Sequence, residues 1–345
     1  MAFLIGTDEA GYGPNLGPLV IAASVWHVPG DDCDVDLYQS LSPWITSGSP
    51  STSRSRSGSP RHADKSLDTT GVTRAGDELP LCVADSKQVY RPGAGLQGLE
   101  RGVLSAAAAL FDTTANDWLE LLAQLCPDAA SQSSTLPWHQ RHNPSIPTAI
   151  SPQQLAADRS RWRQLGEATG IRLVALRAAM IFPEDFNRDV ARLNSKGLLL
   201  SETTLDLVAD CVTPLSQEPI RIVCDKHGGR NHYGALLQSR FNAGLVRVAT
   251  EGRQLSQYDV GTSDQPIEIR FQVGGESFMP SALASMTAKY LRELAMAAFN
   301  AFWQEKVAGL RPTAGYPVDA LRFRHDIEHQ RRSLRIPLET LWRDR

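Results

Sequence analysis

The sequence predicts an α/β fold, on three observations. Short apolar runs of the length of buried strands occur at residues 3–7, 19–28, 171–180 and 220–224. Residues 281–306 carry the apolar spacing of a long helix. Strands and helices follow one another along the chain instead of lying in separate blocks, an order that favours an α/β domain.

The first two strands are expected to be neighbours in the sheet. Residues 3–7 and 19–28 are almost continuously apolar, with Val, Ile and Ala in the second run. The segment between them is rich in residues that form turns, namely Gly11, Gly13, Pro14, Gly17 and Pro18. A short connection of this composition between two strand patterns is typical of paired strands.

The remaining elements follow in order. Residues 99–110 are rich in alanine and predict a helix. In residues 281–306, apolar side chains recur at steps of 4, 3, 4, 3 and 4 from Ala284 to Phe302, a stripe that faces the core of a protein. The other expected elements are helices at residues 184–193 and 201–212, and strands at residues 245–250 and 267–273.

Two segments are expected to be surface insertions or mobile loops. Residues 42–76 and 127–152 are rich in Ser and Pro, and the first also in Arg. Such segments carry little apolar surface with which to offset the entropy of ordering. We therefore expect one α/β domain at residues 1–300 that carries both insertions, followed by a helical, basic extension at residues 301–345.

Charge and composition restrict the class of protein. With 35 Lys and Arg against 38 Asp and Glu, the net charge of -3 excludes a generally basic nucleic-acid-binding surface but not a local basic groove. The five cysteines form no CxxC pair, which indicates reduced thiols in a cytosolic protein and not a zinc site. The sequence has no apolar run of 18 residues and no secretory signal pattern, so a cytoplasmic protein is expected.

Acidic residues stand at the ends of two predicted strands. Asp8 and Glu9 follow the first strand, and Asp225 directly follows residues 220–224. Strand ends in open α/β sheets are where binding sites gather, and carboxylate oxygens are the ligands that Mg²⁺ and Mn²⁺ prefer. The pattern favours a shared metal site, with a solvated loop as the alternative for the Asp8–Glu9 pair.

The glycines after the first strand allow close approach of the backbone to a ligand. Their spacing is neither GxGxxG nor that of a P-loop, so a nucleotide fingerprint is not supported. Exposed backbone N–H groups of such a loop hold phosphate in other proteins. A tight hairpin without a ligand is the alternative.

The motifs, taken in order, resemble ribonuclease HII. Residues 8–20 read DEAGYGPNLGPLV, similar to the DEAGRGPxxGPVV opening of that family. Four further segments resemble later family motifs in the same order, namely Ala84-Asp85-Ser86-Lys87, Val223-Cys224-Asp225, Ala284 to Lys289 with Arg292 and Glu293, and Gly315-Tyr316-Pro317.

The resemblance implies a ribonuclease H-like fold, with a central mixed β-sheet flanked by helices. It implies cleavage of RNA strands, or of single embedded ribonucleotides, in RNA–DNA hybrids or DNA duplexes, with 5′-phosphate and 3′-hydroxyl products. The family uses four carboxylates and two divalent ions, Mg²⁺ or Mn²⁺. A monomer is expected on the same basis.

Residue by residue, the resemblance assigns Asp8, Glu9 and Asp225 as catalytic metal ligands. Glu276 is the expected fourth, although ribonuclease HII has Asp there and Glu is found in the related ribonuclease HIII. Asp259 and Asp264 are the alternatives for the fourth position.

The expected substrate contacts come from the same motifs: Gly11, Tyr12, Gly13, Lys87, Lys289, Arg292 and Tyr316. Tyr12 replaces the arginine of the family's GRG turn, which removes one contact to the RNA–DNA junction. His227 is either a proton-transfer residue or a structural one. Two other functions stay open, a catalytically impaired nucleic-acid-binding relative and a different metal nuclease of the same superfold.

Overall fold

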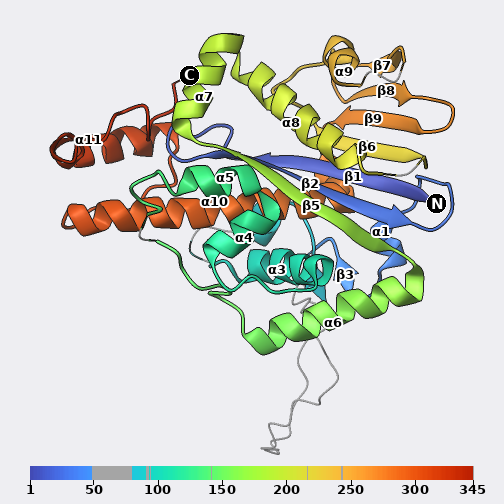
Figure 1. Cartoon of the computed structure of the whole chain (residues 1–345), viewed down its shortest axis with the longest axis horizontal. Coiled ribbons are helices and arrows are strands. Elements are labelled where there is room, and N and C mark those ends of the chain that lie inside the picture. The colour runs from blue at the N-terminus through green and yellow to red at the C-terminus, as the bar shows by residue number, and fades with distance from the viewer. Residues whose placement is uncertain are drawn as a thin grey trace, which may run out of the picture.

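The computed structural model describes residues 1–48, 80–90, 93, 95–140, 142–215, 217–241 and 244–344. A central sheet is covered by helices on both faces, so the expected fold class is confirmed (Figure 1). Most of the expected insertion at residues 42–76 lies outside the described residues. Its first residues, 42–48, include β3 (Ile45–Thr46), which pairs in parallel with β4 (Leu81–Cys82).

The central sheet has seven strands in the order β5-β2-β1-β6-β9-β8-β7. Strands β1, β2 and β5 form an antiparallel meander. Strands β6 and β9 continue the sheet beside β1 and run parallel to it. The sheet is therefore mixed, as the sequence predicts. The strands are β1 (Ala2–Ala10), β2 (Leu19–Val28), β5 (Arg172–Ile181), β6 (Ile220–Asp225), β7 (Arg247–Glu251), β8 (Leu255–Gly261) and β9 (Pro266–Gln272).

Helices form a separate core on each face of the sheet. One face is covered by α10 (Met279–Lys306), with α3 (Gln97–Phe111), α4 (Trp118–Leu125), α5 (Pro127–Ser133) and α6 (Pro152–Thr169) on the same side (Figure 1). The other face is covered by α7 (Pro183–Leu193), α8 (Lys196–Val212) and α9 (Gly234–Arg240). Alternate residues of β1 serve the two cores, Leu4 the first and Ile5 the second.

The N-terminal turns of α10 lie directly against β1. A Cβ atom on Gly6 would lie only 2.0 Å from the backbone nitrogen of Ser281, so this contact requires glycine. Ser281 Oγ donates to the carbonyl of Val223 at 3.1 Å, and Ser24 Oγ donates to that of Pro280 at 2.7 Å. The helix is thereby fixed to three adjacent strands.

The expectation of a mobile loop at residues 127–152 is wrong. The segment contains α5, and Leu136, Trp138 and Ile146 are buried in the core. The Trp138 ring packs edge-on against Phe299 of α10, with 5.1 Å between the centroids. Average composition conceals this because a few large apolar side chains, separated by polar residues, suffice to attach the segment.

The C-terminal region is continuous with the domain. The expected boundary at residue 300 lies inside α10, which ends at Lys306. Phe323 and Ile327 of α11 (Pro317–Ser333), and Leu341 after it, belong to the same core as α10. The shorter elements are α1 (Leu37–Ser40), α2 (Ser86–Val89) and a 3₁₀ turn η1 (Gly275–Ser277). Among the helices of the described ranges, none has the length and apolar character needed to cross a membrane.

Replacing Trp138 by Ala is expected to lower the free energy of unfolding by about 3–5 kcal/mol, because a buried ring is lost and a cavity remains. Denaturant unfolding followed by circular dichroism measures this. The matched control is Val318→Ala on exposed α11, which should change stability by less than about 0.5 kcal/mol. A Trp138→Ala effect as small as that of the control would mean that residues 127–152 are not part of the core.

Candidate active site

Strand pairing brings the predicted carboxylates of β1 and β6 together. Gly6 pairs with Val223 in parallel register, so two residues further along both strands Asp8 comes beside Asp225. Strand β1 runs to Ala10, and Asp8 and Glu9 therefore lie within the strand and not after it. As consecutive strand residues they point to opposite faces, Asp8 toward α10 and Glu9 toward α8.

Burial disfavours the charged forms of Asp8 and Glu9. Burial raises the pKa of Asp8 to about 7, reinforced by the charges of Asp225 and Asp85 and opposed by a hydrogen bond from Ser285. Burial raises the pKa of Glu9 to about 8, and the charges of Asp8 and Asp225 act in the same direction. The two side chains therefore repel further negative charge and favour a proton or a cation.

Asp225 is linked to the next predicted ligand, Glu276. Burial raises the pKa of Asp225, the negative charge of Glu276 raises it further, and the amides of Lys226 and Gly275 donate hydrogen bonds that oppose the shift. Glu276 stands in η1, between the end of β9 and the start of α10. The turn thus brings Glu276 within electrostatic reach of Asp225.

The two alternatives for the fourth carboxylate lie elsewhere on the sheet. In the β8–β9 register Asp259 faces Glu268, four residues back along β9 from Gln272, which is the partner of Asp225. Four strand residues span about 13 Å. Asp264 lies in the turn at the far end of the same hairpin. The geometry therefore favours Glu276 over either of them.

A fifth acidic residue, Asp85, belongs to the cluster although the sequence reasoning selected only Lys87 from its motif. Asp85 is buried at the N-cap of α2, where its Oδ1 accepts from the Lys87 amide at 3.1 Å. Ser285 Oγ lies 3.4 Å from the same oxygen and also donates to Asp8. The signal was present in the sequence, since Asp85 and Ser285 both occur in the family-like motifs.

The two predicted lysines have different surroundings. Lys87 is exposed, and the pKa of its ammonium is raised by Asp85 above all, and by Asp8, Glu276 and Asp225. Lys289 is already paired: its Nζ lies 2.6 Å from Glu293 Oε1 and 4.7 Å from the centre of the Tyr90 ring. Lys87 is thus the cation that faces the carboxylate cluster.

The donor set fits a hard divalent cation. Asp8, Glu9, Asp225 and Glu276 offer only oxygen ligands, which suit Mg²⁺ or Mn²⁺. Burial raises the pKa values of the first three, and neighbouring negative charge, which a dication would balance, raises them further. Within the described ranges, however, no three acidic, His or Cys side chains are already grouped closely enough to hold an ion. The carboxylates would have to turn toward a bound metal.

The loop of residues 11–17 lies next to this cluster. Lys196 Nζ lies 4.6 Å from the centre of the Tyr12 ring, and the Tyr12 hydroxyl lies close to Gly228. Gly13 is exposed, and a Cβ on it would lie 3.9 Å from the ring of Tyr316. Tyr316 is 57% exposed. The structure therefore brings the predicted glycine turn and the predicted stacking tyrosine together.

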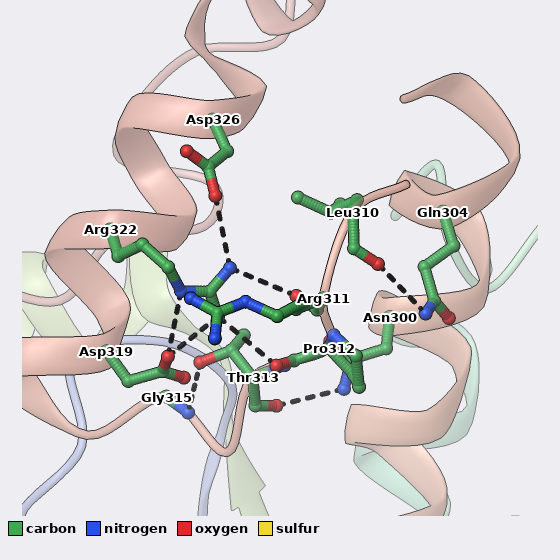
Figure 2. A network of polar contacts seen from close by, with 10 residues as sticks. All are labelled: Asn300, Gln304, Leu310, Arg311, Pro312, Thr313, Gly315, Asp319, Arg322 and Asp326. Carbon is green, nitrogen blue, oxygen red and sulfur yellow. Dashed lines mark hydrogen bonds and ion pairs between the residues drawn. The ribbon is translucent and has the colours of Figure 1, made fainter. Parts of the chain in front are cut away.

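A polar network fixes the turn that carries Tyr316 (Figure 2). The side-chain amide of Asn300 exchanges two hydrogen bonds with the backbone of Thr313, at 2.8 and 2.9 Å. Thr313 Oγ1 accepts from the Gly315 amide at 2.9 Å, and Arg322 binds the carbonyls of the two residues before Thr313. The exposed ring is thus presented from a rigid backbone.

The expectation that Arg292 contacts phosphate is contradicted by its position. Arg292 is 2% exposed, and its Nη2 donates to the carbonyls of Leu16 at 3.3 Å and Ala314 at 3.0 Å. The apolar stripe of the sequence suggested an exposed opposite face, but α10 is buried on nearly all sides in this part. Arg292 instead ties the glycine loop to the Tyr316 turn from within.

His227 has a structural role. It is buried, its Nδ1 lies 3.0 Å from Ser201 Oγ, and its ring packs edge-on against Tyr233 and Phe271. Burial lowers the pKa of His227 to about 3, with the charge of Arg230 acting in the same direction. A neutral, enclosed imidazole of this kind does not exchange protons with a substrate at neutral pH.

Several solved structures are similar to the whole chain. A chain in the structure of the PCNA:RNase HII complex from Archaeoglobus fulgidus is 13% identical, with 99% of this chain and 94% of that chain covered and a TM-score of 0.40. The ribonuclease H2 from Pyrococcus horikoshii OT3 is 14% identical, with 98% and 92% covered and a TM-score of 0.39. Bst-RNase HIII in complex with Mn²⁺ is 15% identical, with 99% and 66% covered and a TM-score of 0.37.

No protein-family model and no curated protein matches the sequence. The three solved proteins are ribonucleases HII or HIII, the group that the sequence motifs resemble. All three likenesses are distant, with 13–15% identity and TM-scores of 0.37–0.40.

Replacing Asp8 by Asn is expected to stabilise the metal-free protein in a pH-dependent way. The pKa of Asp8 is about 7 when folded against an ordinary value of 3.8, so the carboxylate lowers stability progressively as pH rises between these values. The melting temperature of Asp8→Asn should exceed that of the wild type by a margin that grows from about pH 4 to pH 7 and is then constant. Calorimetry in chelator measures it.

The control for this measurement is Asp264→Asn, in the exposed turn between β8 and β9. The melting temperature of Asp264→Asn relative to the wild type should not rise with pH. If the melting temperature of Asp8→Asn exceeds that of the wild type by the same margin at every pH, the ionised carboxylate is not the source of the difference.

Proposed function

We propose that this protein is a metal-dependent endonuclease that cleaves RNA strands or embedded ribonucleotides in RNA–DNA hybrids or DNA duplexes, leaving 5′-phosphate and 3′-hydroxyl ends. The observation that supports the proposal is that Asp8 and Asp225 lie side by side on adjacent parallel strands, with Glu9 and Glu276 within electrostatic reach of Asp225, beside the loop of residues 11–17. The chemistry of the site supports phosphodiester hydrolysis better than nucleotide binding, since no nucleotide fingerprint is present.

The four carboxylates would hold the divalent ions. When bound, such ions stabilise the charge on the phosphate and lower the pKa of an attacking water. Other residues of the protein position the carboxylates. Ser285 orients Asp8, the Gly275 amide orients Asp225, and Lys87 balances negative charge at the rim of the cluster.

The features beside the cluster suit a ribonucleotide. Tyr316 offers an exposed aromatic face beside Gly13, and the described residues include no partner for the amides of Tyr12 and Gly13. An aromatic platform together with backbone groups near a ribose is how proteins distinguish RNA from DNA. These groups support recognition of one ribonucleotide at the site of cleavage.

A second candidate is a nucleic-acid-binding protein of the same fold that has lost catalysis. Two observations favour it: Tyr12 occupies the place of the family's arginine, and the described carboxylates are not already closed around an ion. A different metal nuclease of the fold is a further possibility that substrate choice would identify.

The deciding experiment compares two duplexes, one with a single embedded ribonucleotide and one continuous RNA–DNA hybrid, in Mg²⁺ and in Mn²⁺. We expect cleavage that excess chelator abolishes. Replacing Asp8, Asp225 or Glu276 by its amide should lower kcat/KM at least about a hundredfold, while Asp259→Asn and Asp264→Asn should retain activity.

Each outcome separates the candidates. Binding of both duplexes without cleavage supports the second candidate. Cleavage that survives chelator contradicts the proposed chemistry. Full activity of Glu276→Gln together with loss of activity in Asp259→Asn would identify Asp259, and not Glu276, as the fourth metal ligand.

Tyr316→Ala is expected to raise KM about tenfold for a ribonucleotide-containing duplex, because stacking on one base contributes about 1–3 kcal/mol. Tyr316→Phe keeps the ring and should behave like the wild type. Val318→Ala, an exposed change in the next turn, serves as the control. Equal KM values for all four proteins would exclude stacking on Tyr316.

A further inference from the structure

The segment Leu341–Asp344 lies against the inner side of the loop of residues 11–17. Trp342 forms an antiparallel bridge with Leu16. The Arg343 amide donates to the carbonyl of Asn15 at 2.8 Å, and Asn15 Nδ2 donates back to the carbonyl of Arg343 at 3.0 Å. Residues more than 300 positions apart in the chain are therefore joined by an isolated β-bridge and flanking hydrogen bonds.

The side chain of Arg343 enters the loop itself. Arg343 is 1% exposed, and its Nη2 donates to the carbonyl of Gly11 at 2.6 Å and to that of Pro14. The guanidinium also stands 4.8 Å from the centre of the Phe186 ring. One cation thus holds two carbonyls on either side of Gly13.

Asn187 of α7 holds the segment in place. Its Nδ2 donates to the carbonyl of Trp342 at 2.8 Å, and its Oδ1 accepts from the Asp344 amide at 2.7 Å. The segment is therefore clamped between α7 and the loop, and the position of Arg343 is set by backbone contacts on both sides.

The charge of Arg343 has no acidic counterpart in the described part of the chain. No carboxylate lies within ion-pair distance of it, and its Nε and Nη1 are buried without a hydrogen-bond partner there. Burial and the nearby charge of Arg292 lower the pKa of Arg343 to about 9, so it remains a cation at neutral pH. Arg292, behind the same loop, has Glu293 at 3.9 Å.

This arrangement makes the backbone N–H of Tyr12 a stronger hydrogen-bond donor. The Gly11 carbonyl and the Tyr12 N–H belong to the same peptide group. A cation that binds the carbonyl polarises that group and makes its N–H a better donor, the more so where water is excluded. The carbonyls of Gly11, Pro14, Asn15 and Leu16 are all occupied from within, whereas the Tyr12 and Gly13 amides have no partner in the described residues.

We propose that Arg343 is a positioning residue that fixes the loop of residues 11–17 and polarises the Tyr12 amide to bind a phosphodiester oxygen of the nucleic acid. The inference rests on the proposed function for its ligand class, but its structural part is independent of cleavage. It also gives a role to a buried cation whose guanidinium contacts loop carbonyls and, among the described residues, makes no ion pair.

The test compares Arg343→Gln, which keeps a donor without the charge, with Arg343→Lys, which keeps the charge. We expect KM for the duplex to rise about tenfold in Arg343→Gln and less in Arg343→Lys, with kcat changed less than about threefold in both. In ¹H–¹⁵N spectra the Tyr12 amide proton should move upfield in Arg343→Gln, as its peptide loses polarisation. Arg332→Gln, an exposed arginine of α11, is the matched control and should change neither quantity.

Melting temperatures confirm that the variants are folded. Unchanged KM and an unmoved Tyr12 resonance in folded Arg343→Gln overturn the inference. If the wild type binds the duplex without cutting it, the proposed function fails, and Kd values replace KM in the same comparison. If the wild type binds no duplex and phosphate leaves the Tyr12 amide unmoved, both fail.

Discussion

The close approach of α10 to β1 is the contact on which the rest of the structure depends. Gly6 has no side chain, so the backbone at Ser281 reaches the strand directly. From that fixed start, one helix supplies Ser285 to Asp8, Arg292 to the glycine loop, and Asn300 to the turn that carries Tyr316. η1, immediately before the helix, supplies Glu276. A side chain at residue 6 would displace all of these groups together.

The same packing separates charge within the site. Carboxylates gather at the ends of β1 and β6, where burial and mutual repulsion raise the pKa values of Asp8, Glu9 and Asp225. Two guanidiniums, those of Arg292 and Arg343, are buried behind the loop of residues 11–17, which follows β1. The guanidiniums are solvated by backbone carbonyls of the loop and its neighbours, whereas burial disfavours the charged forms of the carboxylates. A divalent metal ion would balance the carboxylates.

Local pattern predicted most of the sheet and the main helix. Strands β1, β2, β5, β6 and β9 and helix α10 were expected within a few residues, because buried strands and a long apolar stripe have clear signals. Strand β8 was not, because its buried positions include Ser256 beside Tyr258 and Val260. Helix α6 was missed because it is mostly polar and buries only Leu155, Asp158 and Trp162. Residues 127–152 were misread because Trp138 and the other buried apolar side chains are few among many polar residues.

The sequence by itself determined the acids and glycines of the site, since Asp8, Glu9, Asp225 and the turn of residues 11–17 are recognisable as motifs. The tertiary structure alone decided which of Glu276, Asp259 and Asp264 lies near the others, because that depends on strand register across the sheet. It also decided the roles of Arg292 and Arg343. The motif position of Arg292 suggests a phosphate contact at the surface, and no sequence pattern singles out Arg343, yet both are enclosed by backbone carbonyls that come from distant parts of the chain. Charge and spacing are local properties of a sequence, but burial is a property of the packed whole.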